Sequence, residues 1–134
     1  MFTLFTDGGS RGNPGNSACA YFLFDSEGKL SDLGGEFLGT VTNNNAEYAA
    51  LINGLKLAIK KGVTELTVCM DSELAIKQIK GIYKVSSDSI KEQHKEVKYL
   101  EKGFSEIEFK HVPREQNKFA DKLVNIILDV KEDK

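Results

Sequence analysis

"AEYAALINGLKLAIKKG", residues 46–62, is the stretch in which the residue pattern of this chain changes from strands to a helix. Its apolar residues recur at the spacing of one helix face, at Ala49, Ile52, Leu55 and Ile59. Gly62 stands where such a helix would end. The stretch therefore predicts a helix over residues 46–61 that joins two parts of a sheet.

Before this helix, three segments have the composition of β-strands. "MFTLFT" (1–6) alternates and is rich in β-forming residues, so we expect a first strand that ends near Asp7. "DGGSRGNPGNS" (7–17) has the Gly, Asn and Pro content of a loop. "ACAYFLFD" (18–25) and "GKLSDLGGEFLG" (28–39) predict two more strands. Their short connections favour an antiparallel meander.

After the helix, strands and helices alternate. We expect strands at "ELTVCM" (65–70) and "SEIEFKHV" (105–112), and helices at 72–80, 89–102 and 117–130. The order β-β-β-α-β-α-α-β-α predicts a single α/β domain over residues 1–134, with helices flanking a five-stranded mixed sheet of three antiparallel and then two parallel strands. A right-handed crossover would place strand 65–70 parallel to the first strand. Ligand sites favour the edge where the carboxyl ends of such strands meet.

The composition indicates a globular protein that does not enter a membrane. Hydrophobic residues make up 40% and charged residues 28% of the chain. No apolar run approaches the roughly 20 residues of a membrane span, and no leader pattern is present, so we expect a cytoplasmic protein. Cys19 and Cys69 lie in apolar runs and are expected to be buried, reduced thiols. The net charge of −2 does not indicate a nucleic-acid binder, although bound divalent cations would reverse the sign of a local acidic cluster.

Four acidic residues are expected to converge on the sheet edge defined above: Asp7, Glu47, Asp71 and Asp121. Neighbouring strands lie about 5 Å apart, so carboxylates at two strand ends could share a cation that relieves their repulsion. Each acid also has a purely structural interpretation. Asp71 or Ser72 could cap a helix, and Asn44 with Glu47 has the spacing of a capping box. Asp7 could open a turn, and Asp121 could be an exposed helical charge.

Four ordered motifs carry a resemblance to a known family. They are "DGGSRGNPG" (7–15), "TNNNAEYAAL" (42–51), "VCMDS" (68–72) and "HVPREQNKFAD" (111–121). Together they resemble ribonuclease H of type 1 over nearly the whole chain. The resemblance implies the ribonuclease H fold. It also implies metal-dependent endonucleolytic hydrolysis of the RNA strand of RNA/DNA hybrids, which leaves 5′-phosphate and 3′-hydroxyl ends.

The resemblance also implies the residues that carry out the reaction. Asp7, Glu47, Asp71 and Asp121 match the four metal ligands of the family. An oxygen-only site of this kind suits two Mg²⁺ ions, with Mn²⁺ as a substitute. Asp7 would bridge the ions, Asp121 would hold the ion that activates water, and Glu47 and Asp71 would hold the ion beside the leaving oxygen. His111 would shuttle a proton or help product leave, and its structural alternative is a histidine hydrogen-bonded to backbone at a strand end.

Seven further residues are candidates for contacts with the hybrid: Gly8, Ser10, Arg11, Asn13, Asn43, Asn44 and Asn117. The glycines permit close approach to a sugar-phosphate chain, while Ser10 and Asn13 offer hydrogen bonds. Asn43 and Asn44 match family positions that contact the minor groove, where amides can read 2′-hydroxyls, and one of them could instead cap the helix. Asn117 matches an asparagine that positions active-site elements.

The chain departs from well-known bacterial members of this family in one segment. Those proteins carry a long basic handle between the two middle helices, whereas this chain has only "GIYKVSSD" (81–88). Arg11 or the lysine stripe of Lys91, Lys95, Lys98 and Lys102 would have to compensate, although such a stripe is also typical of a solvated face. A nuclease acting on double-stranded RNA or DNA junctions and a non-catalytic nucleic-acid-binding module are the alternatives. We expect a monomer.

Overall fold

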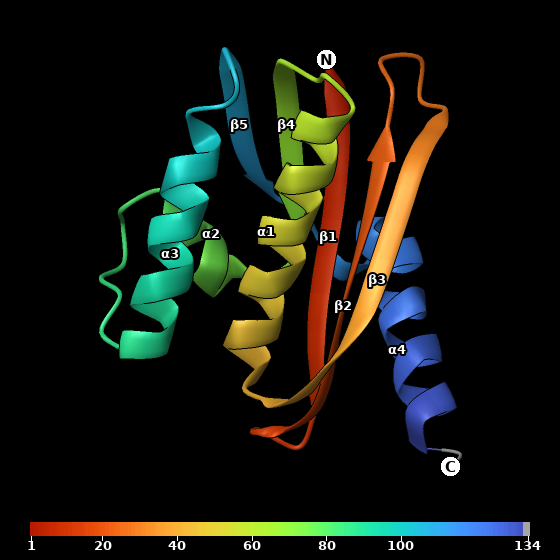
Figure 1. Cartoon of the computed structure of the whole chain (residues 1–134), viewed down its shortest axis with the longest axis vertical. Coiled ribbons are helices and arrows are strands. Elements are labelled where there is room, and N and C mark those ends of the chain that lie inside the picture. The colour runs from red at the N-terminus through yellow and green to blue at the C-terminus, as the bar shows by residue number, and fades with distance from the viewer. Residues whose placement is uncertain (133–134) are drawn as a thin grey trace.

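A computed structural model describes residues 1–132 as a single mixed sheet with helices on both faces (Figure 1). The strands are β1 (Phe2–Arg11), β2 (Gly15–Phe24), β3 (Leu30–Val41), β4 (Glu65–Met70) and β5 (Glu106–His111). The helices are α1 (Asn43–Lys60), α2 (Glu73–Ile79), α3 (Asp88–Glu101), the 3-10 turn η1 (Arg114–Asn117) and α4 (Lys118–Glu132). Residues 133 and 134, the end of the expected domain, lie outside the described residues.

The topology agrees with the sequence prediction. The five strands lie in the order β3-β2-β1-β4-β5. β1 and β3 each pair antiparallel with β2, whereas β4 lies parallel to β1 and β5 lies parallel to β4. The expected mixed sheet and the expected neighbours β1 and β4 are therefore confirmed.

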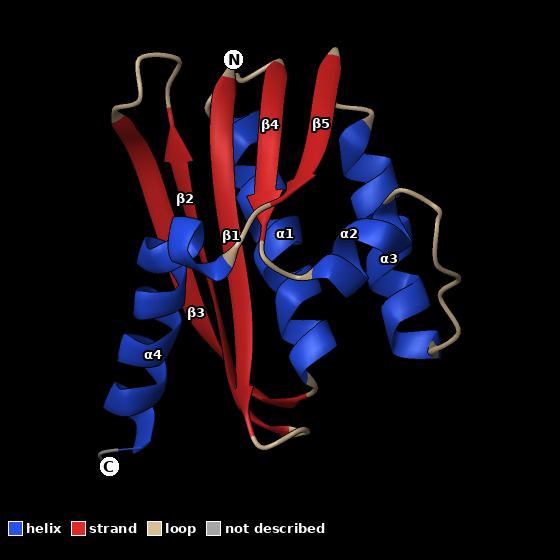
Figure 2. Cartoon of the chain, turned by 180° about the vertical axis from the view of Figure 1, so that it is seen from behind, coloured by secondary structure: helices blue, strands red, loops and turns tan. Residues whose placement is uncertain are grey.

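The helices form two unequal layers. α1, α2 and α3 cover one face of the sheet, and α4 lies on the other face over β1, β2 and β3 (Figures 1 and 2). The larger hydrophobic core lies under α1–α3. The smaller core lies under α4 and consists of Ala18, Ala20, Ala120, Val124 and Leu128. Cys19 and Cys69 are buried and free, as expected.

The glycine-rich segment 7–17 is mostly strand, so its prediction as a loop was wrong. β1 continues through Arg11 because its residues pair with β2 from Thr3↔Phe24 to Arg11↔Asn16. Asp7 therefore lies within β1 and not at its end. The parallel pairing of β1 with β4 does stop at Thr6↔Met70. Asp7 is consequently the first β1 residue beyond the end of β4.

The start of α1 also differs from the prediction. The helix begins at Asn43, and its capping box joins Thr42 to Asn45. The alternative capping box of Asn44 and Glu47 was wrong, so the Glu47 side chain is not used as a cap. η1 was not predicted. No helix within residues 1–132 is long and apolar enough to cross a membrane.

Candidate metal centre

Asp7 and Asp71 lie next to each other because each directly follows one residue of the last β1–β4 register pair. Thr6 pairs with Met70 in the last register position, and Asp71 follows directly. Ser72, rather than Asp71, caps α2 by accepting a hydrogen bond from the Ala75 N–H at 3.2 Å. The Asp71 carboxylate is therefore free of a capping role and is available to the sheet edge.

Glu47 reaches the same place because α1 passes directly over Gly8. A Cβ atom at residue 8 would lie 2.2 Å from the backbone carbon and oxygen of Ala46 and 2.4 Å from the Glu47 nitrogen. Only glycine permits this approach. One carboxylate oxygen from each of Asp7, Glu47 and Asp71 lies within 4.8 Å of the others.

The fourth acid lies in the same cavity but outside this close group. Asp121, in the first turn of α4, lines a pocket of about 160 Å³ together with Asp7, Glu47 and Asp71. Arg114 of η1 also lines this pocket. The sequence prediction missed Arg114. Its position in the motif "HVPREQNKFAD", between His111 and Asp121, was the available signal.

Burial and repulsion from neighbouring carboxylates disfavour the ionised forms of Asp7 and Glu47. Asp7 and Glu47 are only 6% and 5% exposed. Burial, followed by the carboxylates of Asp71 and Asp121, raises the pKa of Asp7 to about 8. Burial, followed by Asp7 and Asp71, raises the pKa of Glu47 well above its usual value. The Arg114 guanidinium acts on both in the opposite direction but does not cancel these effects.

The donor set fits a hard divalent cation. Three carboxylates offer oxygen ligands only, which is the preference of Mg²⁺ and related ions. Oε2 of Glu47 is buried without a hydrogen-bond partner among the described residues. A buried charged oxygen without a partner is costly, and a bound cation would remove that cost. Asp7, Glu47 and Asp71 could therefore hold a metal ion.

Asn117 connects this group to the backbone of β1. Its side-chain amide is buried and donates hydrogen bonds to the Thr6 carbonyl at 2.9 Å and to Oδ2 of Asp71 at 3.3 Å. The amide thus fixes Asp71 relative to β1. The family resemblance implies a positioning role for Asn117, and these two hydrogen bonds are contacts through which it could act.

The β1–β2 turn is fastened to the first turn of α1 by two hydrogen bonds. The Ser10 N–H donates to Oδ1 of Asn43 at 3.1 Å, and the Asn43 N–H donates to Oδ1 of Asn13 at 2.9 Å. These three candidate contact residues are therefore adjacent at the rim of the pocket, which Ser10 and Asn43 also line. The contacts order the rim before any ligand arrives.

Asn44 and Asn45 fasten the same turn of α1 to α2 and α3. Nδ2 of Asn44 lies 3.5 Å from Oε1 of the buried Gln78, and Tyr48 donates to that oxygen at 3.0 Å. Asn45 donates to Oε1 of Gln93 at 2.9 Å, and Gln93 donates back to the Asn45 carbonyl at 3.1 Å. The sequence analysis missed Gln78 and Gln93, because a sequence pattern does not show which side chains from distant segments will form hydrogen bonds.

Within the described residues, two predicted residues make no hydrogen bond or ion pair with the carboxylates of the acidic group. Arg11 lines the acidic pocket, but its guanidinium is paired with α4. Arg11 forms ion pairs with Asp129 at 2.8 Å and Glu132 at 2.6 Å, so its guanidinium fastens α4 to β1. His111 is exposed at the end of β5, opposite Met70, and does not line the acidic pocket. Its ring makes no hydrogen bond within residues 1–132, so the structure does not show the backbone-bonded alternative either.

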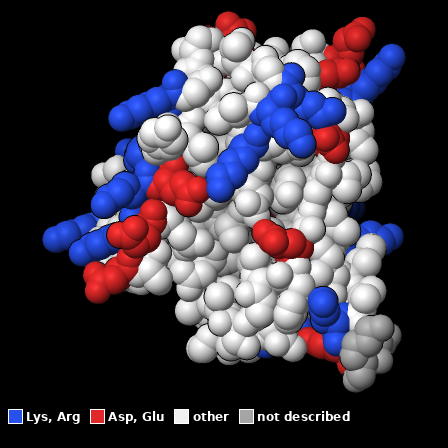
Figure 3. All heavy atoms as spheres, viewed as in Figure 1, with Lys and Arg blue, Asp and Glu red and all other residues white. Residues whose placement is uncertain are grey.

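The lysine stripe on α3 is interspersed with acids. Figure 3 shows basic and acidic side chains next to one another on this side of the molecule. Lys98 donates to the Ile79 carbonyl at 2.6 Å and pairs with Glu101, while Glu96 pairs with Lys56 at 3.0 Å. These contacts agree with the interpretation as a solvated face.

The chain is similar to known proteins along nearly its whole length. A family model described as "Reverse transcriptase-like" matches residues 5–126. Ribonuclease HI of Halobacterium salinarum is 37% identical over 125 residues, which cover 93% of this chain and 63% of that protein. A bifunctional protein of Mycobacterium tuberculosis is 38% identical over 125 residues, which cover 92% of this chain and 34% of that protein. The chain thus spans less than two thirds of the length of both relatives.

Solved structures show the same similarity in three dimensions. RNase H1 from Halobacterium salinarum has a TM-score of 0.93 at 36% identity, covering 96% of this chain and 97% of that chain. LC11-RNase H1 in complex with RNA/DNA hybrid has a TM-score of 0.92 at 35% identity, covering 98% of this chain and 99% of that chain. The similarity therefore includes every element that supplies an acid to the pocket.

Proposed function

The chain belongs to the type 1 ribonuclease H family, and from this premise we propose that it is a metal-dependent endonuclease that hydrolyses the RNA strand of RNA/DNA hybrids. The products would carry 5′-phosphate and 3′-hydroxyl ends. One observation carries the proposal: three carboxylates from β1, α1 and β4 lie within 4.8 Å of one another. The complex of LC11-RNase H1 with an RNA/DNA hybrid supports the choice of substrate.

We further propose that Mg²⁺ is the natural cofactor, that two ions act together, and that Mn²⁺ can replace them. Asp7, Glu47 and Asp71 would hold the metal, with Asp121 completing the set from α4. When bound, the ions would polarise the phosphate and make water nucleophilic at neutral pH. All four acids come from one chain, which supports activity as a monomer.

The surrounding residues prepare the pocket for an anionic substrate. The Arg114 guanidinium lies in the acidic pocket and can accompany a phosphate into it. Asn117 holds Asp71 through its Nδ2 atom, so the carboxylate cannot rotate freely. His111, exposed on β5, can reach substrate or product only from outside the pocket, which suits product release better than activation of water.

Recognition of RNA is assigned to the rim formed by the first turn of α1. Telling RNA from DNA requires contacts to 2′-hydroxyls in the minor groove. Asn13, Asn43 and Ser10 hold one another in place there, so their remaining polar atoms are pre-organised for such contacts. Oδ1 of Asn44 is buried without a partner among the described residues and could accept a hydrogen bond from a 2′-hydroxyl group.

A cleavage assay with matched substrates tests this function. RNA/DNA hybrid and double-stranded RNA, each labelled on one strand or the other, and labelled single-stranded RNA are incubated with Mg²⁺, Mn²⁺ or EDTA. We expect cleavage of the RNA strand of the hybrid alone, loss of cleavage in EDTA, and loss in Asp7→Asn. Cleavage that survives both chelation and Asp7→Asn would show that the acidic group is not the catalytic centre.

A further inference from the structure

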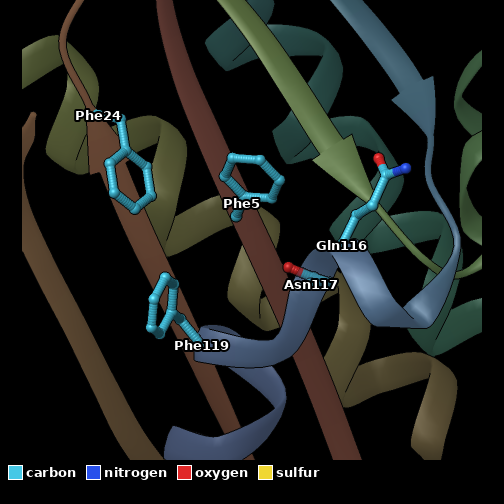
Figure 4. A pocket seen from close by; sticks show the side chains of 5 residues that line it. All are labelled: Phe5, Phe24, Gln116, Asn117 and Phe119. Atoms are coloured by element: carbon cyan, nitrogen blue, oxygen red, sulfur yellow. The ribbon is translucent and has the colours of Figure 1, made fainter. Parts of the chain in front are cut away.

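A second pocket lies beside η1, which also contributes Arg114 to the acidic pocket. It has a volume of about 120 Å³ and is lined by Phe5, Phe24, Gln116, Asn117 and Phe119. Figure 4 shows the three phenylalanine rings around one space, with η1 and the start of α4 along its edge. We call this the Phe119 pocket. An apolar cavity of about 150 Å³ can bind benzene, so this smaller pocket can take the edge of a planar ring but cannot enclose the whole ring.

The walls of the Phe119 pocket are arranged for stacking. Phe5 meets Phe24 edge to face, with ring centroids 5.7 Å apart. Phe119 lies 5.9 Å from Phe22 and is 67% exposed, although it is one of the largest apolar side chains. α4 covers β1, β2 and β3 farther along and leaves this end of the sheet open (Figure 2). One face of the Phe119 ring is therefore available to a planar ligand.

A buried polar atom faces the same space. Oδ1 of Asn117 has no hydrogen-bond partner among residues 1–132, and it points toward the phenylalanine rings in Figure 4. The amide orientation is fixed because Nδ2 donates to Thr6 and Asp71. Every nucleobase carries an N–H group on its edge that could supply the missing donor.

Three lysines without ion-pair partners among the described residues lie on α4 and β5, close to the residues that line the pocket. Lys118 precedes Phe119 on α4, and Lys122 lies one turn farther on; both are exposed. Lys110 of β5 is exposed and lies in the same cross-strand row as Cys69 and Phe5. In the described part of the chain, none of these three lysines forms an ion pair.

Acidic residues are also present near the pocket. Glu115 lies in η1 beside Gln116, and Asp121 follows Phe119 on α4. Over residues 110–122 the four basic residues Lys110, Arg114, Lys118 and Lys122 outnumber these two acids. The local net charge is therefore positive.

We propose that the Phe119 pocket binds a base of a single-stranded nucleic-acid extension that adjoins the hybrid. Aromatic side chains combined with cations that follow the backbone are the features by which proteins hold single strands. Continuity with the metal centre through η1 favours this partner over a second copy of the chain. The placement beside a hybrid rests on the proposed function, whereas the pocket itself does not.

The test compares a blunt hybrid with hybrids that carry a short overhang of RNA or DNA at the 5′ or 3′ end. 2-Aminopurine at the first unpaired position reports stacking by loss of fluorescence, and anisotropy in EDTA reports affinity without cleavage. We expect at least one overhang to bind about tenfold more tightly than the blunt hybrid, since stacking on one side chain contributes about 1–3 kcal/mol. An abasic unit at that position should remove the gain.

Phe119→Ala should remove the gain while blunt-hybrid cleavage in Mg²⁺ is unchanged. Tyr99→Ala is the matched control, because Tyr99 is 71% exposed but lies on α3. Lys118→Gln should weaken overhang binding and lower its salt dependence. The proposal is overturned if no overhang is preferred, if Tyr99→Ala loses the gain equally, or if sedimentation shows that Phe119 instead mediates a dimer.

The same experiments distinguish a failure of the nuclease assignment from a failure of the pocket proposal. A wild-type protein that cleaves no hybrid contradicts the nuclease assignment. In that case, quenching of a single-stranded 2-aminopurine oligonucleotide by wild type but not by Phe119→Ala would still support the pocket. A protein that cleaves blunt hybrid but quenches no oligonucleotide would retain the nuclease assignment and lose the pocket.

Discussion

Asp7 shows how one residue carries a conflict between folding and function. The side chain is 6% exposed and lies beside Asp71 and Glu47. A buried carboxylate among other carboxylates is unfavourable in its ionised form. A metal ligand must nevertheless be ionised to bind. The repulsion among these buried carboxylates would therefore be relieved by a bound cation.

The first prediction is that the metal-free protein loses stability as pH rises. The pKa of Asp7 is raised from 3.8 to about 8 in the folded chain. A raised pKa contributes stability that is fully present below pH 4 and is lost as pH rises toward 8. Asp7→Asn should thus stabilise the metal-free protein at pH 8 by more than about 1 kcal/mol, since one pKa unit corresponds to about 1.4 kcal/mol. Urea denaturation in EDTA at pH 5 and pH 8 measures this.

Glu108→Gln serves as the control for that experiment. Glu108 is exposed on β5 and lies outside the acidic pocket. Its neutralisation should leave the difference in unfolding free energy between the two pH values unchanged. If Asp7→Asn behaves like Glu108→Gln, repulsion in the acidic group is not a cost of folding.

The second prediction concerns Gly8. A methyl group there would lie 2.2 Å from the Ala46 backbone, so Gly8→Ala must push α1 away from β1. We expect a loss of about 1–3 kcal/mol or more from overpacking, together with reduced cleavage because Glu47 moves. Gly9→Ala is the matched variant, since its Cβ would meet only a Val124 methyl at 3.2 Å. Equal thermal stability of the two variants would contradict this account.

At the residue scale, the sequence predicted which residues form the site better than it predicted why each residue is needed. It placed Asp7, Glu47 and Asp71 at one sheet edge, and their carboxylates do meet there. It interpreted the glycines of the first motif as room for substrate, whereas Gly8 makes room for the chain's own helix. Close backbone contacts between distant segments leave no pattern in a sequence, so this reason could not be predicted.

The first turn of α1 is the element on which the site depends. Three consecutive asparagines, Asn43 to Asn45, attach it to the β1–β2 turn, to α2 and to α3. Thr42 caps the helix by accepting a hydrogen bond from the Asn45 N–H at 3.1 Å. The orientation of this turn sets both the rim of the pocket and the position of Glu47. A local defect here should affect the active site more than the core.

The third prediction tests that dependence. Thr42→Ala removes the cap and should cost about 1 kcal/mol of stability. It should also weaken hybrid binding, because the asparagines of the rim lose their fixed orientation. Thr42→Ser keeps the hydroxyl and should restore both properties. Chemical denaturation and fluorescence anisotropy measure them, and a loss of stability with unchanged hybrid affinity would show that the turn does not position the rim.

At the element scale, the apolar periodicity and Gly62 at the end of α1 were informative, whereas the glycines of residues 8–15 were misleading. The order of strands and helices was correct because alternating and helical apolar patterns record which face is buried. The extent of β1 was wrong because Gly, Ser and Arg in residues 8–11 have turn composition, yet pairing with β2 holds them extended. Tertiary pairing overrides local preference in such segments.

For the molecule as a whole, the acidic group joins four segments that are distant in sequence. β1, α1, β4 and α4 each contribute one acid to the pocket. A ligand that binds all of them is bound only by the folded chain. By mass action, such a ligand stabilises the entire fold by about 2.7 kcal/mol when present at 100 times its Kd.

The fourth prediction is therefore that Mg²⁺ raises the melting temperature of the whole protein. For a domain of this size, 1 kcal/mol corresponds to roughly 3–5 °C, so saturating Mg²⁺ should raise Tm by several degrees. Asp71→Asn removes a carboxylate of the close group and should abolish the rise, whereas Glu108→Gln should keep it. Differential scanning calorimetry across a Mg²⁺ series measures both. A rise that persists undiminished in Asp71→Asn would show that Asp71 is not a ligand of the bound ion, because the variant has lost that carboxylate.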